Sequence, residues 1–187
     1  ADASVMTERE VRKLQDALLE SIRDLRKSHA SWNGYRESFA VKLQEWDSLS
    51  ESVELETSDG LFPIRSEAEV QTAHESREEV MSKGRKVDGV LLQILQDTSR
   101  YCSDIRELLD PHLSLLLAIP LRVSGTETMD TCSIVQRLSN YEFEMKQNYA
   151  IFKSILVSLS HQTTQDVVQT YILTLKYSEL PFPFPLA

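Results

Sequence analysis

The sequence predicts an all-α protein: an elongated bundle of three long amphipathic helices of coiled-coil type, with one or two short extra helices. Two long rows of apolar residues recur at every seventh position. Only 5 glycines and 6 prolines occur in 187 residues, far fewer turn residues than a β-sandwich needs. Hydrophobic residues make up 41% and charged residues 26%, as in folded domains. We expect one bundle domain over residues 1–180 and an extended tail over 181–187.

The first predicted helix covers residues 5–56. Every seventh residue from Val11 is apolar, and the row reads Val11, Leu18, Leu25, Trp32, Phe39, Trp46, Val53. A second row, three positions later, is mixed, and Ile22 and Leu43 compensate where it is polar. A strict seven-residue period predicts supercoiling around a partner helix. Gly34 indicates a weak point, with a kink or a break as the alternatives.

The second predicted helix covers residues 66–109. A cluster of helix-breaking residues at 57–63 precedes it, and Ser66 with Glu69 has the spacing of a capping box. Its apolar row reads Ala73, Val80, Val87, Ile94, Tyr101, Leu108. Gly84 and Gly89 predict a flexible or kinked centre.

The last third of the chain predicts shorter elements. Pro111 stops the second helix and opens a short apolar helix over 112–119, and 120–130 is expected to be a loop. A third long helix is predicted over 130–161, with a seam of Ile134, Leu138, Tyr141, Met145, Phe152, Ile155, Leu159. Residues 164–178 fit either a strand or a helix; the chain offers no second strand, so we expect a helix. The tail should be extended, near polyproline II.

Charge and apolar runs exclude several function classes. The net charge is −9 and no basic block is present, so neither nucleic acid nor an anionic lipid surface is an expected partner. The longest apolar run, 113–121, is about half the length of a membrane span. Cys102 and Cys132 predict two buried free thiols in a reducing, cytoplasmic or otherwise intracellular compartment, with a disulfide between them as the alternative.

The sequence offers little for catalysis or metal binding. His29, His74, His112 and His161 lie in four different segments without metal-ligand spacing, although folding could gather them. Neither a phosphate-binding glycine loop nor a nucleophile elbow occurs. Only His29, His74 and Arg77 place titratable groups on the helical seams. We therefore expect no enzyme, no cofactor and no metal site.

Two aromatic features point to protein interactions. Trp32, Tyr35, Phe39 and Trp46 line the first seam, where they either pack inside the chain or meet a partner. Phe182 and Phe184 alternate with prolines in the tail, which is either a domain boundary or a motif that docks into an aromatic groove. All six are candidate partner-binding residues.

The stretch 39–95 carries Phe39-x3-Leu43-x2-Trp46-x2-Leu49, an interruption at 57–63, His74, and Lys86-Val87-Asp88 followed by Val90-Leu91. It resembles a spectrin-type repeat, a three-helix coiled coil, and this resemblance implies a cytoskeletal spacer or docking scaffold. The main prediction is a non-catalytic scaffold or adaptor subunit of an intracellular complex. It binds other proteins, or a second copy of itself, through helix–helix contacts. The alternative is a mechanical spacer of the spectrin-repeat type.

Overall fold

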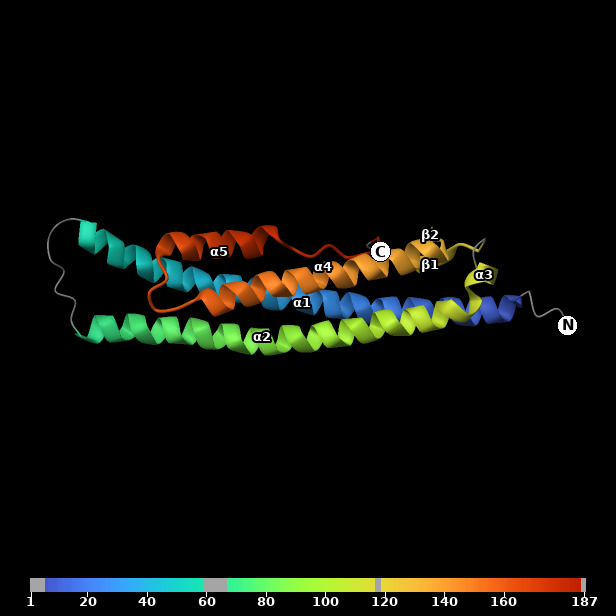
Figure 1. Ribbon diagram of the computed structural model, residues 1–187, viewed down its shortest axis with the longest axis horizontal. Coiled ribbons are helices and arrows are strands. Elements are labelled where there is room, and N and C mark those ends of the chain that lie inside the picture. Colours follow the sequence, from blue (N-terminus) through green and yellow to red (C-terminus); the bar gives the residue numbers. More distant parts are fainter. Residues whose placement is uncertain (1–5, 59–66, 117–118, 186–187) are drawn as a thin grey trace. The chain divides into compact units, whose positions relative to one another are not determined.

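The computed structural model describes the backbone of residues 6–58, 67–116 and 119–185, with their side chains except at 47–58 and 69. The elements, in chain order, are α1 (Glu8–Ser58), α2 (Glu67–Leu109), a 3-10 turn (Asp110–His112), α3 (Leu113–Leu116), β1 (Leu121–Ser124), β2 (Glu127–Met129), α4 (Thr131–Ser158) and α5 (Gln165–Tyr177) (Figure 1). The prediction of a mainly helical fold is confirmed. The capping box at Ser66 and the breaker residues after Ser58 lie outside the described residues.

The glycines do not break the long helices. Both α1 and α2 continue as α-helix through Gly34, Gly84 and Gly89, so the alternative of a break at Gly34 is wrong. Gly84 is instead a site of close packing, where an added Cβ would lie 2.6 Å from Leu156 Cδ1 and 2.8 Å from Phe39 Cε2. This glycine is therefore explained by the space it leaves for two neighbouring helices.

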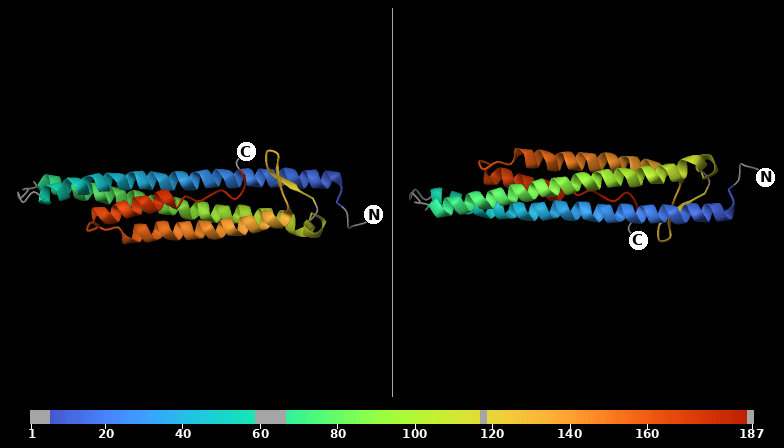
Figure 2. Two further views of the ribbon diagram at one scale, coloured as in Figure 1. Left: turned by 90° about the horizontal axis from the view of Figure 1, so that it is seen from above. Right: turned by 90° about the horizontal axis from the view of Figure 1, so that it is seen from below.

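The expected loop at 120–130 is a two-stranded antiparallel hairpin. Leu121 pairs with Met129, and Gly125 takes a positive φ of 48° in the turn, which a residue without Cβ adopts easily. The side-chain amide of Gln15 on α1 bonds both the N–H and the carbonyl oxygen of Arg122, at 2.7 and 2.8 Å. Figure 2 shows the hairpin crossing the first part of α1. These strands are too short to give a clear alternating pattern in the sequence.

The contacts divide the chain into two compact units. Unit 1 comprises residues 1–31, 93–147 and 180–187, and unit 2 comprises 32–92 and 148–179. The helices α1, α2 and α4 each give a segment to both units, whereas the hairpin belongs to unit 1 and α5 to unit 2. The prediction of one domain over 1–180 stays a prediction.

The predicted apolar rows form the cores of these units. On α1 the side chains of Leu18, Leu25, Trp32, Phe39 and Trp46 are fully buried. The whole predicted seam of α4 is buried as well. On α2 the row is buried from Val80 to Ile94 and then drifts off the buried face, because seven residues of a straight α-helix turn about 20° less than two full turns. The buried positions beyond it are Thr98, Cys102, Ile105 and Leu109, in place of Tyr101 and Leu108.

Unit 1 is closed by polar contacts at its edges. Arg106 on α2 donates to the Glu142 carboxylate on α4 at 2.7 Å.

The predicted helix at 164–178 is confirmed as α5, which buries Val168, Ile172 and Leu175 in unit 2. Among the described residues, we find no helix with both the length and the apolar character needed to cross a bilayer.

Candidate functional site

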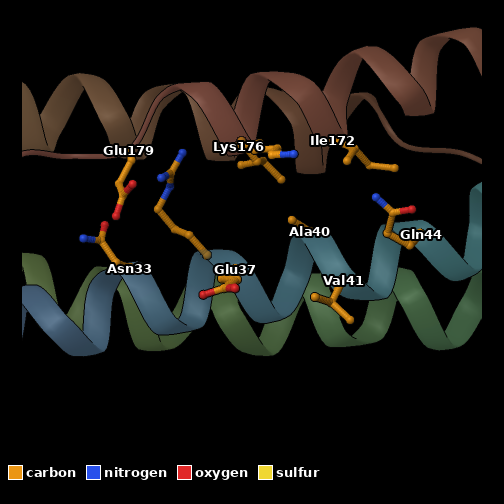
Figure 3. A pocket seen from close by; sticks show the side chains of 10 residues that line it. Asn33, Glu37, Ala40, Val41, Gln44, Ile172, Lys176 and Glu179 are labelled. Carbon is orange, nitrogen blue, oxygen red and sulfur yellow. The ribbon is translucent and has the colours of Figure 1, made fainter.

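A groove of about 340 Å³ runs between α1 and α5 in unit 2 (Figure 3). We call it the α1–α5 groove, and its lining residues are Asn33, Arg36, Glu37, Ala40, Val41, Gln44, Ile172, Leu175, Lys176 and Glu179. On each side the lining positions are spaced by three or four residues, so each side is one helical face. The lining combines four apolar side chains, Ala40, Val41, Ile172 and Leu175, with six charged or amide side chains.

Val41 is the most exposed apolar side chain of this groove, at 60% of its surface. It also lines a second, wider groove of about 640 Å³ between α1 and α2, as does Glu37. Val41 therefore stands on a ridge with a depression on each side. Lys42, which lines the wider groove, pairs with Glu45 at 3.0 Å and Glu79 at 3.5 Å, and its hydrogen bond to Glu45 raises its pKa.

A chain of buried and part-buried hydrogen bonds fixes the end of α5 against α1 and α4. Trp32 Nε1 donates to Asn148 Oδ1 at 2.9 Å, and Asn148 Nδ2 donates to the Ser178 carbonyl oxygen at 2.5 Å. Arg36 Nη2 donates to Ser178 Oγ at 2.7 Å. We call these four residues the polar clamp. It holds in place the two helices that form the α1–α5 groove.

Arg36 links the clamp to the groove. Its side chain is only 3% exposed, yet it lines the groove. Burial lowers the pKa of this guanidinium, and the nearby Glu179 carboxylate partly offsets that effect. A buried guanidinium held by a serine hydroxyl gives the groove a fixed positive charge beneath an exposed rim.

Three potential metal ligands meet elsewhere in unit 2. His74 and Glu78 lie one turn apart on α2, and His161 lies in the turn after α4. The His74 and His161 rings stack at 3.9 Å with a 6° interplanar angle. His161 Nε2 lies 2.5 Å from Glu78 Oε1, and this contact lowers the pKa of Glu78. Folding thus joins two histidines that are separate in the sequence, and His74 is exposed rather than packed on a seam.

The predicted aromatic seam faces inward. Trp32, Phe39 and Trp46 are fully buried, and Phe39 meets Phe152 edge-on at 5.1 Å. Arg77 lies over the Trp46 ring at 5.3 Å. In these three residues the structure shows packing inside the chain, with no surface left for a partner. Tyr35 alone of the four keeps a large exposed surface, at 40%.

The tail also packs on its own chain, in unit 1. Phe184 is buried, and Phe182 lies edge-on to His29 at 5.1 Å and beneath the Arg26 guanidinium at 5.2 Å. Arg137 Nη1 donates to the Pro183 carbonyl oxygen at 3.1 Å. Both phenylalanines therefore occupy an aromatic site that the chain itself supplies.

Both cysteines are free thiols, so the disulfide alternative is wrong. Cys102 is buried, and burial raises its pKa well above the ordinary value. Cys132 is exposed, contrary to the prediction that both are buried. It occupies the first turn of α4, just before the buried seam begins at Ile134.

Sequence reasoning missed the residues that build the groove. Asn148 occupies a seam position between Met145 and Phe152, where a polar residue signals a buried hydrogen bond. Val41 is apolar but lies outside both rows of α1, which is the pattern of an exposed contact residue. Comparison of the chain with protein families, with curated proteins and with solved structures gave no match.

Proposed function

We propose that this chain is a non-catalytic interaction module whose α1–α5 groove binds an amphipathic helix of another protein. The observation that carries the proposal is a groove walled by two helical faces, whose lining combines four apolar side chains with polar side chains that are mostly exposed. In helix-in-groove recognition the bound helix contacts the groove through residues at positions i, i+3, i+4 and i+7. The lining residues on each wall of this groove have the same spacing of three or four residues.

Charge favours a basic partner over a second copy of the chain. Each copy carries −9, so two copies repel one another as they approach. The groove lining itself is balanced, with two acids, Glu37 and Glu179, and two bases, Arg36 and Lys176, so the preference for a basic partner rests on the net charge of −9. Complementary charge speeds association and sets the orientation of the partner. The expected ligand is therefore a helix with an apolar stripe flanked by Lys or Arg.

The test is a selection of helical peptides on the full chain. A displayed library of amphipathic helices is selected on the wild-type protein, and affinities are then measured by fluorescence anisotropy. Val41→Glu puts a charge on the apolar ridge that borders the groove and should weaken the selected peptides about tenfold or more. Val157→Glu is the matched control, since Val157 is 73% exposed in the same unit and does not line the groove.

Two results would reject this proposal. One is that the selected peptides bind the Val41→Glu and Val157→Glu variants equally well. The other is that the wild type is a dimer by light scattering and Val41→Glu makes it a monomer, which would assign the groove to a second copy of the chain. A groove-specific peptide rich in Lys or Arg supports the proposal.

The spectrin-type spacer is the second candidate, and one observation favours it. Three of the residues that carry the resemblance, Phe39, Leu43 and Trp46, are buried within the chain. A spacer needs internally satisfied seams of this kind, arranged as a bundle of three long helices. It predicts a monomer with an extended small-angle scattering profile and no peptide that depends on Val41.

A further inference from the structure

The cluster of His74, Glu78 and His161 has the composition of a metal site. Two imidazole nitrogens and one carboxylate oxygen lie within 4.8 Å of one another. The spacing of His74 and Glu78, four residues apart on one helix, directs both side chains to the same face of α2. His161 approaches that face from a segment 83 residues further along the chain than Glu78.

The backbone that carries the third ligand is already fixed. Arg77 Nη1, also on α2, donates to the His161 carbonyl oxygen at 2.6 Å. The turn itself is closed by two hydrogen bonds between Ser160 and Thr163, at 2.9 and 3.0 Å. The backbone at all three ligands is therefore fixed, by helix α2 for His74 and Glu78 and by these hydrogen bonds for His161. Rotation of the side chains would bring the ligand atoms onto an ion.

We propose that His74, Glu78 and His161 bind one divalent transition-metal ion, with Zn²⁺ as the best match. Imidazole nitrogen is a preferred ligand of zinc and its neighbours in the first transition series, whereas Mg²⁺ and Ca²⁺ prefer sites built from oxygen. Two histidines and one carboxylate form a known type of zinc ligand set that leaves a fourth position for water. The ion would link the turn after α4 to α2.

The required rearrangement is small. Tetrahedral Zn²⁺, with bonds of about 2.0–2.2 Å, places its ligand atoms roughly 3.4 Å apart. The Glu78 carboxylate, now 2.5 Å from His161 Nε2, has to withdraw a little, and the stacked rings have to turn toward a common point. None of the three side chains is buried, so this rotation meets little resistance. The inference is independent of the proposed function.

The test is zinc titration of the full, chelator-treated chain by calorimetry, in a Cys132→Ser background that removes the exposed competing thiol. We expect one ion per chain, bound with micromolar or tighter affinity. Loss of a residue that only hydrogen-bonds to a metal ligand weakens metal binding about 10–100-fold. Loss of a ligand itself should cost at least as much, so we expect His74→Ala, Glu78→Gln and His161→Ala each to weaken zinc binding at least about tenfold. Glu75→Gln is the control, an exposed carboxylate next to His74 in the sequence but outside the cluster.

A spectroscopic readout separates a built site from scattered surface binding. Co²⁺ bound in place of Zn²⁺ should give the intense visible absorption of a four-coordinate site, and this band should be lost in His161→Ala. Circular dichroism verifies that each variant is folded. Absence of saturable zinc binding, or variants that bind zinc as the wild type does, would overturn the proposal.

Discussion

At the scale of single residues, Asn148 shows how a polar group can be required within an apolar seam. It is nearly fully buried, and it satisfies both the Trp32 indole N–H and the Ser178 carbonyl oxygen. A seam that was entirely apolar would leave both of these groups unpaired. Loss of the partners of the buried N–H and the part-buried carbonyl oxygen would offset what an apolar side chain at this position could contribute.

Replacing Asn148 should therefore destabilise the protein strongly. Asn148→Ala leaves the buried Trp32 N–H and the part-buried Ser178 carbonyl oxygen without these partners; one unpaired buried group costs about 1–3 kcal/mol, so the expected loss is roughly 2 kcal/mol. Urea unfolding followed by tryptophan fluorescence measures it. Asn140→Ala, an exposed asparagine on the same helix, is the control and should change stability by less than about 0.5 kcal/mol. Equal effects of the two substitutions would contradict the role of the polar clamp.

The two glycines of α2 predict opposite effects of the same substitution. Gly89 has nothing within 4 Å of an added Cβ, so Gly89→Ala should stabilise the helix by about 0.5–1 kcal/mol. At Gly84 the new methyl group meets Leu156 and the fully buried Phe39 ring below 3.0 Å. Overpacking costs about 1–3 kcal/mol and exceeds the gain in helix propensity.

Thermal or urea unfolding of the two variants checks this pair. Gly89→Ala should lie above the wild type in stability and Gly84→Ala below it. If both substitutions stabilise the protein, Gly84 is simply a weak helix position, as its sequence alone indicated, and the close packing is not a constraint.

At the scale of elements, the start of α4 depends on one carboxylate. Asp130 precedes the helix, and its two oxygens accept from the Ser133 N–H and Oγ–H, each at 2.8 Å. The backbone N–H of Ser133 gives the largest contribution to lowering the pKa of Asp130 below its ordinary value of 3.8. A lowered pKa in the folded state means that the carboxylate stabilises the fold above the ordinary pKa. That contribution disappears as the pH falls through the lowered value.

Asp130→Asn separates this charge from the hydrogen bond to the backbone. Asparagine caps a helix about as well as aspartate but does not titrate. The melting temperature of the wild type should exceed that of Asp130→Asn at neutral pH, and the difference should shrink as the pH falls below about 3.8. Melting curves across this acidic range measure it, and a difference independent of pH would contradict the assignment.

The long helices could be predicted because their apolar rows are regular over many turns. The row on α1, from Leu18 to Trp46, is buried as expected. The α2 row fails after Ile94, because the seven-residue period and the helix turn are not equal. The hairpin was missed because its strands have four and three residues, too few for an alternating pattern to stand out.

The candidate sites were harder to predict than the helices. The α1–α5 groove needs α5 beside α1, so that Ala40 and Ile172 line one groove, and the histidine cluster needs His161 beside His74. Both depend on how the chain returns after α4, which no spacing in the sequence encodes. The burial of the tryptophans, by contrast, follows from the seven-residue periodicity that predicted the first helix. That periodicity is why packing inside the chain was one of the two alternatives for Trp32 and Trp46.

At the scale of the whole molecule, one question is whether the two units unfold together. Both tryptophans, Trp32 and Trp46, lie in unit 2, whereas Cys102 lies buried in unit 1. Tryptophan fluorescence therefore reports one unit, and reaction of the Cys102 thiol with an alkylating reagent reports the other. The Cys102 measurement uses a Cys132→Ser variant, which lacks the exposed thiol. The wild type is the control for the reagent, because its exposed Cys132 should react in the native state.

We expect the two probes to give the same urea midpoint. The helices α1, α2 and α4 each supply residues to both units, and helix formation is cooperative along a continuous segment. On α1, buried Leu25 in unit 1 and buried Trp32 in unit 2 are only seven residues apart, about two turns of one helix. Loss of one end should therefore weaken the other, as in two-state unfolding of a single domain. If Cys102 becomes reactive at a urea concentration where the tryptophan signal is still native, the units unfold separately and the prediction of one domain over 1–180 is wrong.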